Sequence, residues 1–233
     1  MPLRLAFDLD GVLADMDREV TRQAHALFSQ SASPADDPAD DVDDDGEPGV
    51  PPPARLALSP RQQRALWRHI RSLKNFWETL EETETGVIAR LATLASDHRW
   101  EPIFLTSRPG TSGETTQIQT QRWLESKGSV RPSVFVVSGS RGLIAASLEL
   151  DFVIDDRLEN CLDVVADSKA RAVLVYRGDA QRLPASVAHL GIGVSASTAA
   201  CLEMLAAIEA DASRPRPIDR VKRFLGLKEP ALD

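Results

Sequence analysis

Short apolar runs alternate with longer amphipathic segments along most of the chain. The apolar runs predict buried strands at 3–8, 102–106, 133–138, 152–155 and 172–176, with a weaker candidate at 192–194. Between them, apolar residues recur every three or four positions and predict helices at 15–29, 60–73, 85–98, 115–127, 141–148, 158–166 and 197–210. Strands that alternate with helices predict an α/β fold, in which helices cover both faces of a mostly parallel sheet.

Residues 31–58 interrupt this pattern. The segment is rich in Asp, Pro and Gly and contains almost nothing to bury, which predicts a disordered acidic insertion. Asp-x-Asp spacings such as Asp41 to Asp43 occur in it, but the spaced oxygen ligands that close on a Glu in an EF-hand loop are missing. We therefore interpret the segment as a solvated linker rather than a calcium site.

The net charge of −8 is concentrated in that insertion. Eight of the 35 acidic residues lie between Asp36 and Glu47, and the others equal the 27 lysines and arginines in number. The rest of this 233-residue chain is formally neutral, and we expect no nucleic-acid partner. The length suits one α/β domain with a small insertion, or two small domains. Nothing in the sequence predicts an oligomeric state.

Cysteine and hydropathy patterns indicate the cellular compartment. Cys161 and Cys201 lack the spacing of a CxxC motif or a metal finger, which favours a reducing environment. No signal-peptide-like segment and no apolar run near the roughly 18 residues of a membrane span is present, so we expect a cytoplasmic protein without a membrane partner. Zinc is not expected, because no HxH or HExxH spacing occurs among His25, His69, His98 and His189.

The C-terminal tail, 213–233, is basic and amphipathic. Its cations surround apolar residues such as Val221 and Phe224, a pattern that suits nucleic acid, a membrane surface or the acidic insertion. A terminal helix docked on its own domain is the simplest interpretation.

Polar side chains follow three of the predicted strands. Asp8 and Asp10 end the first, Thr106-Ser107-Arg108-Pro109 ends the second, and Asp155-Asp156 ends the fourth. Ligands bind beyond the carboxyl ends of parallel strands, so we expect these residues to converge. Asp8 and Asp10 share one side of an extended segment, and Gly11 allows the sharp turn that leaves room for a ligand.

Two carboxylates on one face repel each other unless a cation neutralises them, and hard oxygen ligands suit Mg²⁺. The hydroxyls and turn amides at Thr106, Ser107 and Arg108 suit phosphate oxygens. Each feature also has a purely structural interpretation, since Asp156 with Glu159 could form a helix capping box and Thr106 could be a turn hydroxyl. Their joint occurrence at three strand ends favours a catalytic site.

These segments resemble motifs of the haloacid dehalogenase superfamily of phosphatases. Asp8-Leu9-Asp10-Gly11-Val12-Leu13 resembles its first motif, Phe104-Leu105-Thr106-Ser107-Arg108-Pro109 its second and Phe152-Val153-Ile154-Asp155-Asp156 its fourth. Within the superfamily, the run 151–161 is similar to the 5′(3′)-deoxyribonucleotidases. The resemblance implies a Rossmann-like three-layer core at 1–15 and 81–212. It also implies a small helical cap at 16–80 that carries the acidic insertion.

The resemblance also implies residue roles. Asp8 would attack phosphorus to form an aspartyl-phosphate, and Asp10 would protonate the leaving oxygen and then activate water. Mg²⁺ would be held by Asp8, the backbone carbonyl of Asp10 and Asp156, with Asp155 acting through water.

The third motif departs from the superfamily pattern. Its usual lysine is replaced by Arg141 in Ser138-Gly139-Ser140-Arg141-Gly142, while Lys127 and Lys169 are weaker candidates. Arginine can bind phosphate bidentately, so the exchange could preserve binding while it changes the rate.

The expected activity is Mg²⁺-dependent hydrolysis of a small phosphate monoester, with a nucleoside monophosphate as the leading substrate. Aromatic residues of the cap, namely Phe28, Trp67, Phe76 and Trp77, could stack on a nucleobase or could pack the cap helices together. A phosphatase of a non-nucleotide metabolite and a catalytically silent phosphate- or nucleotide-binding protein, suggested by Arg141, are the alternatives.

Overall fold

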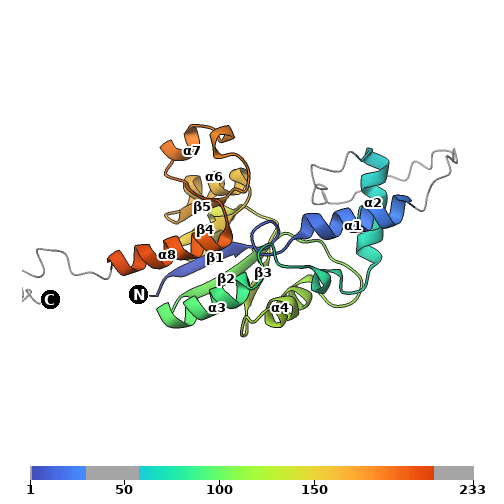
Figure 1. The fold of residues 1–233 in the computed structure, drawn as a ribbon, viewed down its shortest axis with the longest axis horizontal. Coiled ribbons are helices and arrows are strands. Elements are labelled where there is room, and N and C mark those ends of the chain that lie inside the picture. The colour runs from blue at the N-terminus through green and yellow to red at the C-terminus, as the bar shows by residue number, and fades with distance from the viewer. Residues whose placement is uncertain (1, 30–57, 213–233) are drawn as a thin grey trace, which may run out of the picture.

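The computed structural model describes residues 2–29 and 58–212, and their strands form one six-stranded parallel sheet (Figure 1). The strands are β1 (Arg4–Asp8), β2 (Glu101–Thr106), β3 (Ser133–Val136), β4 (Phe152–Asp155), β5 (Arg171–Val175) and β6 (Gly193–Ser195). They lie in the order β3-β2-β1-β4-β5-β6, and every neighbouring pair is parallel. The predicted α/β fold is confirmed, and the weak sixth strand candidate is part of the sheet.

Seven helices correspond to those predicted from periodicity: α1 (Met16–Ser29), α2 (Pro60–Ser72), α3 (Val87–His98), α4 (Thr116–Ser126), α5 (Arg141–Ser147), α6 (Leu158–Asp167) and α8 (Thr198–Ala212). Three shorter elements were not predicted: the 3-10 helices η1 (Phe76–Thr79) and η2 (Ala180–Arg182), and α7 (Ser186–His189). Each spans too few residues for a helical period to be visible in the sequence.

Successive apolar residues of β1, β2, β4 and β5 enter opposite cores. Phe7 packs in the core that contains Leu91 of α3 and Leu205 of α8, whereas the adjacent Ala6 packs in the core that contains Val164 of α6. This alternation follows from the period of two along a strand. Helices therefore cover both faces of the sheet, and the architecture is the three-layer, Rossmann-like one that was predicted.

Helices α1 and α2 are inserted between β1 and α3. They contact each other, with His69 Nε2 3.1 Å from Gln23 Oε1, and Figure 1 shows the pair projecting beyond the end of β1. The segments entering and leaving the pair are joined by backbone hydrogen bonds, from Asp15 N to Glu81 O and from Thr83 N to Leu13 O. Apart from Leu58, the predicted acidic insertion lies outside the described residues, as does the predicted basic tail.

Candidate active site

The predicted residues meet where the strand order changes direction. β1 lies between β2 and β4, and the chain continues through β2 and β3 on one side of β1 and through β4, β5 and β6 on the other. Asp8, Thr106 and Asp155 are the last residues of β1, β2 and β4. In open α/β sheets this change of direction creates a crevice at the carboxyl ends of the strands, which is the usual ligand-binding position.

Asp8 and Arg141 form a buried ion pair at this point. Arg141 Nη2 donates to Asp8 Oδ1 at 2.8 Å, and only about 5% of Arg141 is exposed. Its Nε has no hydrogen-bond partner in the described part of the chain and lies 3.8 Å from Asp155 Oδ2. Neither alternative candidate takes this place, because Lys127 pairs with Glu81 and Lys169 is exposed.

The start of α5 explains how Arg141 reaches the site. Ser140 caps the helix by accepting a hydrogen bond from Leu143 N, and Gly142 lies against the backbone of α6. A Cβ on Gly142 would come within 2.2 Å of Asp163 O, so only glycine permits this approach. The Ser-Arg-Gly sequence thus places Arg141 at the carboxyl ends of the strands, beside Asp8.

Asp155 and Asp156 occupy different environments. Asp155 is buried and accepts hydrogen bonds from Arg157 N at 2.8 Å and from Asn160 Nδ2 at 2.9 Å. Asp156 lies against Gly11, where an added Cβ would come within 1.9 Å of Asp156 Oδ2. The alternative interpretation of Asp156 as a helix cap with Glu159 is wrong, because Arg157 occupies the N-cap of α6 and makes no side-chain capping bond.

Burial and mutual repulsion disfavour the charged forms of these acids. Burial and the neighbouring Asp155 raise the pKa of Asp8 well above its usual value, despite the opposing effect of Arg141. Burial and Asp155 also raise the pKa of Asp156 to about 7, and burial raises that of Asp155. Because burial and the neighbouring carboxylates disfavour the ionised forms, a bound cation would stabilise them.

The donors present fit a small hard cation such as Mg²⁺. The close approach of Asp156 to Gly11 brings its carboxylate beside the turn that follows Asp10, just after β1 ends at Asp8. In the described ranges, no group of three or more His, Cys, Asp or Glu side chains forms a metal cluster. A set of two carboxylates, one carbonyl and water is smaller than such a cluster, and Mg²⁺ commonly keeps several waters and few protein ligands.

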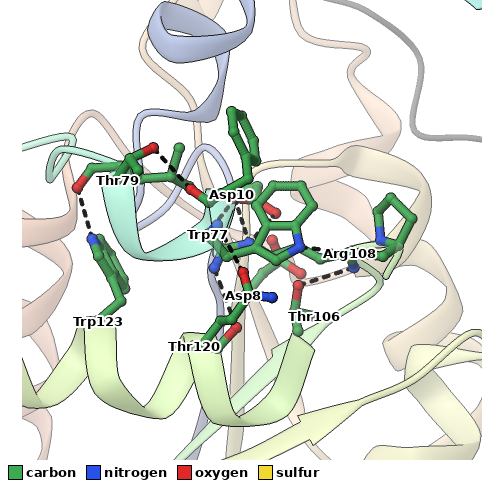
Figure 2. Close-up of polar contacts among 12 residues, drawn as sticks. Asp8, Asp10, Trp77, Thr79, Thr106, Arg108, Thr120 and Trp123 are labelled. Atoms are coloured by element: carbon green, nitrogen blue, oxygen red, sulfur yellow. Dashed lines mark hydrogen bonds and ion pairs between the residues drawn. The ribbon is translucent and has the colours of Figure 1, made fainter. Parts of the chain in front are cut away.

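Arg108 does not occupy the predicted phosphate-binding position. Its side chain is completely buried and holds the Asp10 carboxylate, with Nη2 2.7 Å from Oδ1 and Nε 2.9 Å from Oδ2 (Figure 2). Thr106 is buried and accepts from Arg108 N at 3.2 Å, whereas Ser107 is exposed. The physical reason is that carboxylate, hydroxyl and aromatic neighbours already surround the guanidinium, which leaves it no accessible surface.

The aromatic residues predicted for the cap are largely buried. Trp77 and Phe76 are about 0% and 1% exposed, and Trp67 is also buried. Phe28 is partly buried and packs against the same core. Their structural interpretation, packing of the helical segments, is the one that the structure favours.

Arg177 belongs to the site but was not among the predicted residues. It lies two residues after the end of β5, and its guanidinium donates to Gly11 O and to Glu84 Oε1. Glu84 in turn accepts hydrogen bonds from Thr198 N and Ala199 N at the start of α8. The rule that site residues follow strand ends applies equally to the fifth strand and could have identified Arg177.

Comparison with known proteins identifies the fold. No protein-family profile and no curated protein matches the chain. Among solved structures, the chain is similar to a haloacid dehalogenase-like family hydrolase from Xanthomonas campestris, with a TM-score of 0.53 and 17% identity over 91% of this chain and 98% of that one. It is also similar to a protein from Thermotoga maritima assigned as a β-phosphoglucomutase, with a TM-score of 0.54 and 16% identity over 88% and 99% of the two chains.

A hydrolase from Pseudomonas syringae gives a TM-score of 0.50, with 16% identity over 88% of this chain and 99% of that one. At these identities the likeness defines the fold, and the chain has the fold of haloacid dehalogenase-like hydrolases. None of the three is described as a nucleotidase, so the resemblance to that group stays a prediction. Within 2–29 and 58–212, no helix is both long and apolar enough to cross a membrane.

Proposed function

We propose that the protein hydrolyses a small phosphate monoester through an aspartyl-phosphate on Asp8. The observation that carries this proposal is the buried contact of Arg141 with Asp8, at the strand end where Asp10, Asp155 and Asp156 also lie. A cation beside a carboxylate both stabilises that carboxylate and can neutralise the phosphoryl oxygens as they approach it.

The residues divide the proposed reaction between them. Asp8 attacks phosphorus and the ester P–O bond breaks, while Asp10 donates a proton to the departing oxygen. Asp10 then takes a proton from water, which attacks phosphorus, releases inorganic phosphate and restores the Asp8 carboxylate. Thr106 and Ser107 bind phosphoryl oxygens, and Arg141 holds both Asp8 and the transferred group.

Mg²⁺ is the proposed cofactor. It would be held by Asp8, Asp156 and the backbone carbonyl of Asp10, with Asp155 acting through water. The ion would supply positive charge to the phosphoryl oxygens. We also propose that α1 and α2 form a cap over the site, with the core at 1–15 and 81–212.

Two classes of substrate are candidates. Nucleoside monophosphates are the first class to test, because the run 151–161 resembles the deoxyribonucleotidases. A non-nucleotide metabolite is the second candidate, and burial of Trp67, Phe76 and Trp77 favours it, since these aromatic faces cannot stack on a base.

A panel of phosphate esters, with released phosphate measured in Mg²⁺ and in EDTA, tests the activity. We expect turnover of at least one ester in Mg²⁺, none in EDTA and none in Asp8→Asn, because an amide cannot act as the attacking carboxylate. Asp151→Asn is the matched control, since Asp151 lies just before the strand that ends in Asp155, and its carboxylate accepts a hydrogen bond from Arg4 N at that opposite end. Binding of phosphate without turnover of any ester would instead support a silent binding protein.

A further inference from the structure

Arg108 sits in a closed aromatic and polar box. Its guanidinium carbon lies 4.9 Å from the ring centre of Trp77 and 5.6 Å from that of Trp123, and Nη1 lies 3.3 Å from Thr120 Oγ1. Figure 2 shows the carboxylate of Asp10 at the remaining side of this box. A guanidinium with aromatic rings beside it and a carboxylate along its edge has little freedom to rotate.

Other hydrogen bonds hold the box in place. Trp77 Nε1 donates to Pro109 O at 2.9 Å and Trp77 N donates to Gln119 Oε1 at 3.1 Å. Trp123 Nε1 donates to Leu80 O at 2.7 Å. Both indoles are therefore hydrogen-bonded to backbone carbonyls, and neither can turn away from Arg108 without breaking that hydrogen bond.

The contact pattern leaves Asp10 partly free. Its side chain is 17% exposed, whereas that of Arg108 is 0% exposed. Arg108 Nε and Nη2 bind one edge of the carboxylate, so rotation of this carboxylate is restricted while part of it stays open toward solvent. A group that transfers a proton gains most from such fixed orientation, since transfer requires hydrogen-bond reach.

We propose that Arg108 is a positioning residue that fixes the Asp10 carboxyl group for proton transfer to the leaving oxygen, and that it does not bind the phosphoryl group. This role rests on the proposed phosphatase function. Trp77 and Trp123 are the supports of Arg108, which explains why two tryptophans are buried beside a catalytic carboxylate. Trp77 of η1 and Trp123 of α4 thus contact Arg108, which in turn contacts Asp10 just after the end of β1.

The dependence of the rate on the leaving group separates positioning from phosphate binding. p-Nitrophenyl phosphate needs little protonation of its leaving oxygen, whereas the best alkyl phosphate from the panel needs it fully. For Arg108→Lys and Arg108→Met we expect kcat on the alkyl ester to fall by about 100-fold, but by only about threefold on p-nitrophenyl phosphate. KM and the inhibition constant of inorganic phosphate should stay within about threefold of wild type.

A combination with Asp10→Asn provides the second readout. Because Arg108 acts through Asp10, Arg108→Lys should change kcat by less than about threefold in the Asp10→Asn background. Arg90→Lys is the matched control, since Arg90, in the first turn of α3, makes an exposed ion pair with Glu203 of α8, and the exchange should leave both substrates unaffected. Trp77→Phe, which removes the bond to Pro109 O, should reproduce the leaving-group pattern more weakly and covers the case in which Arg108→Met does not fold.

Four results would overturn the inference, and the first three leave the proposed function standing. Equal losses on both esters with a weaker inhibition by phosphate of about tenfold or more would assign Arg108 to phosphate binding. Multiplying effects of Arg108→Lys and Asp10→Asn, or an unchanged kcat on the alkyl ester, would contradict positioning. If wild type hydrolyses no ester at all, the proposed function fails and the role of Arg108 fails with it.

Discussion

Gly11 shapes the site without contributing a side chain. It has a φ of +85°, a conformation that other residues rarely adopt, and its Cα lies against the carboxylate of Asp156. The same residue therefore turns the chain after Asp10 and leaves the space in which Asp156 sits. Two separate constraints, one on backbone and one on volume, act at a single position.

A comparison of Gly11→Ala with Gly86→Ala should distinguish the effect of backbone conformation from the effect of side-chain volume. Gly86 also has a positive φ, +79°, but an added Cβ would meet nothing within 4 Å. Each variant should lose about 1–2 kcal/mol of unfolding free energy through backbone strain. Only Gly11→Ala should also lose the stabilisation by Mg²⁺, because its methyl group displaces Asp156. Retention of the Mg²⁺ effect in Gly11→Ala, measured by thermal unfolding, would contradict the assigned position of Asp156.

Arg141 is the second residue whose replacement is informative. Arg141→Lys keeps the positive charge beside Asp8, and we expect kcat within about tenfold of wild type. Arg141→Met removes the charge and should lower kcat by about 100-fold or more, as loss of a preorganised donor commonly does. Steady-state kinetics on the best ester of the panel measures both effects. Equal activity of the two variants would show that the charge at this position is not used.

At the scale of elements, the sequence was most informative where a pattern extends over many residues. Strands and long helices were predicted within a few residues, since periodicity depends only on which face is buried. Asp8, Thr106 and Asp155 could be located because parallel strands align their carboxyl ends. The contact between Arg108 and Asp10 joins residues 98 positions apart, and nothing local to either residue marks it. The position of Arg108 in the second motif predicted a phosphate group as its binding partner. In the folded protein its partner is the carboxylate of Asp10.

Glu84 lies just before α3 and connects it to α8 and to the segment after β5, and it offers a test at this scale. Its carboxylate accepts from Thr198 N and Ala199 N at the start of α8, and from Arg177 after β5. Burial raises the pKa of Glu84, but the hydrogen bonds from Ala199, Thr198 and Arg177 outweigh it and bring the pKa below its usual value. The carboxylate therefore stabilises the fold when it is ionised.

Glu84→Gln should lower the free energy of unfolding by about 1–2 kcal/mol at pH 7, because charged hydrogen bonds at a helix start are lost. A lowered pKa contributes stability that is present above the unfolded value of about 4.5 and is lost as pH falls through the folded value. The difference between wild type and variant should therefore shrink at pH 3.5, as urea unfolding would measure. Glu203→Gln, in an exposed ion pair, is the control and should change little at either pH.

At the scale of the whole molecule, the acidic residues of the candidate site lower the stability of the fold, and the proposed chemistry requires them. Asp8, Asp155 and Asp156 converge from β1 and β4, and each has a pKa above its usual value. A fold optimised only for stability would not bring three such groups together. Arg141 balances part of this charge, and a cation would balance more of it. The sheet order, which makes β1 and β4 neighbours, is what imposes the repulsion.

This arrangement predicts how pH changes the effect of Mg²⁺ on stability. The pKa of Asp156 is raised to about 7, so the metal-free folded protein keeps a proton that the unfolded chain has lost, and stability falls as pH rises from about 4 to about 7. Mg²⁺ needs the ionised carboxylate, which at pH 5.5 is roughly 30-fold less populated than at pH 8. Saturating Mg²⁺ should therefore stabilise the protein by about 2 kcal/mol more at pH 8 than at pH 5.5. Thermal unfolding with Mg²⁺ or EDTA at both values measures this difference, and Asp156→Asn should abolish most of it. An equal Mg²⁺ effect at the two pH values in wild type would show that Asp156 does not hold the ion.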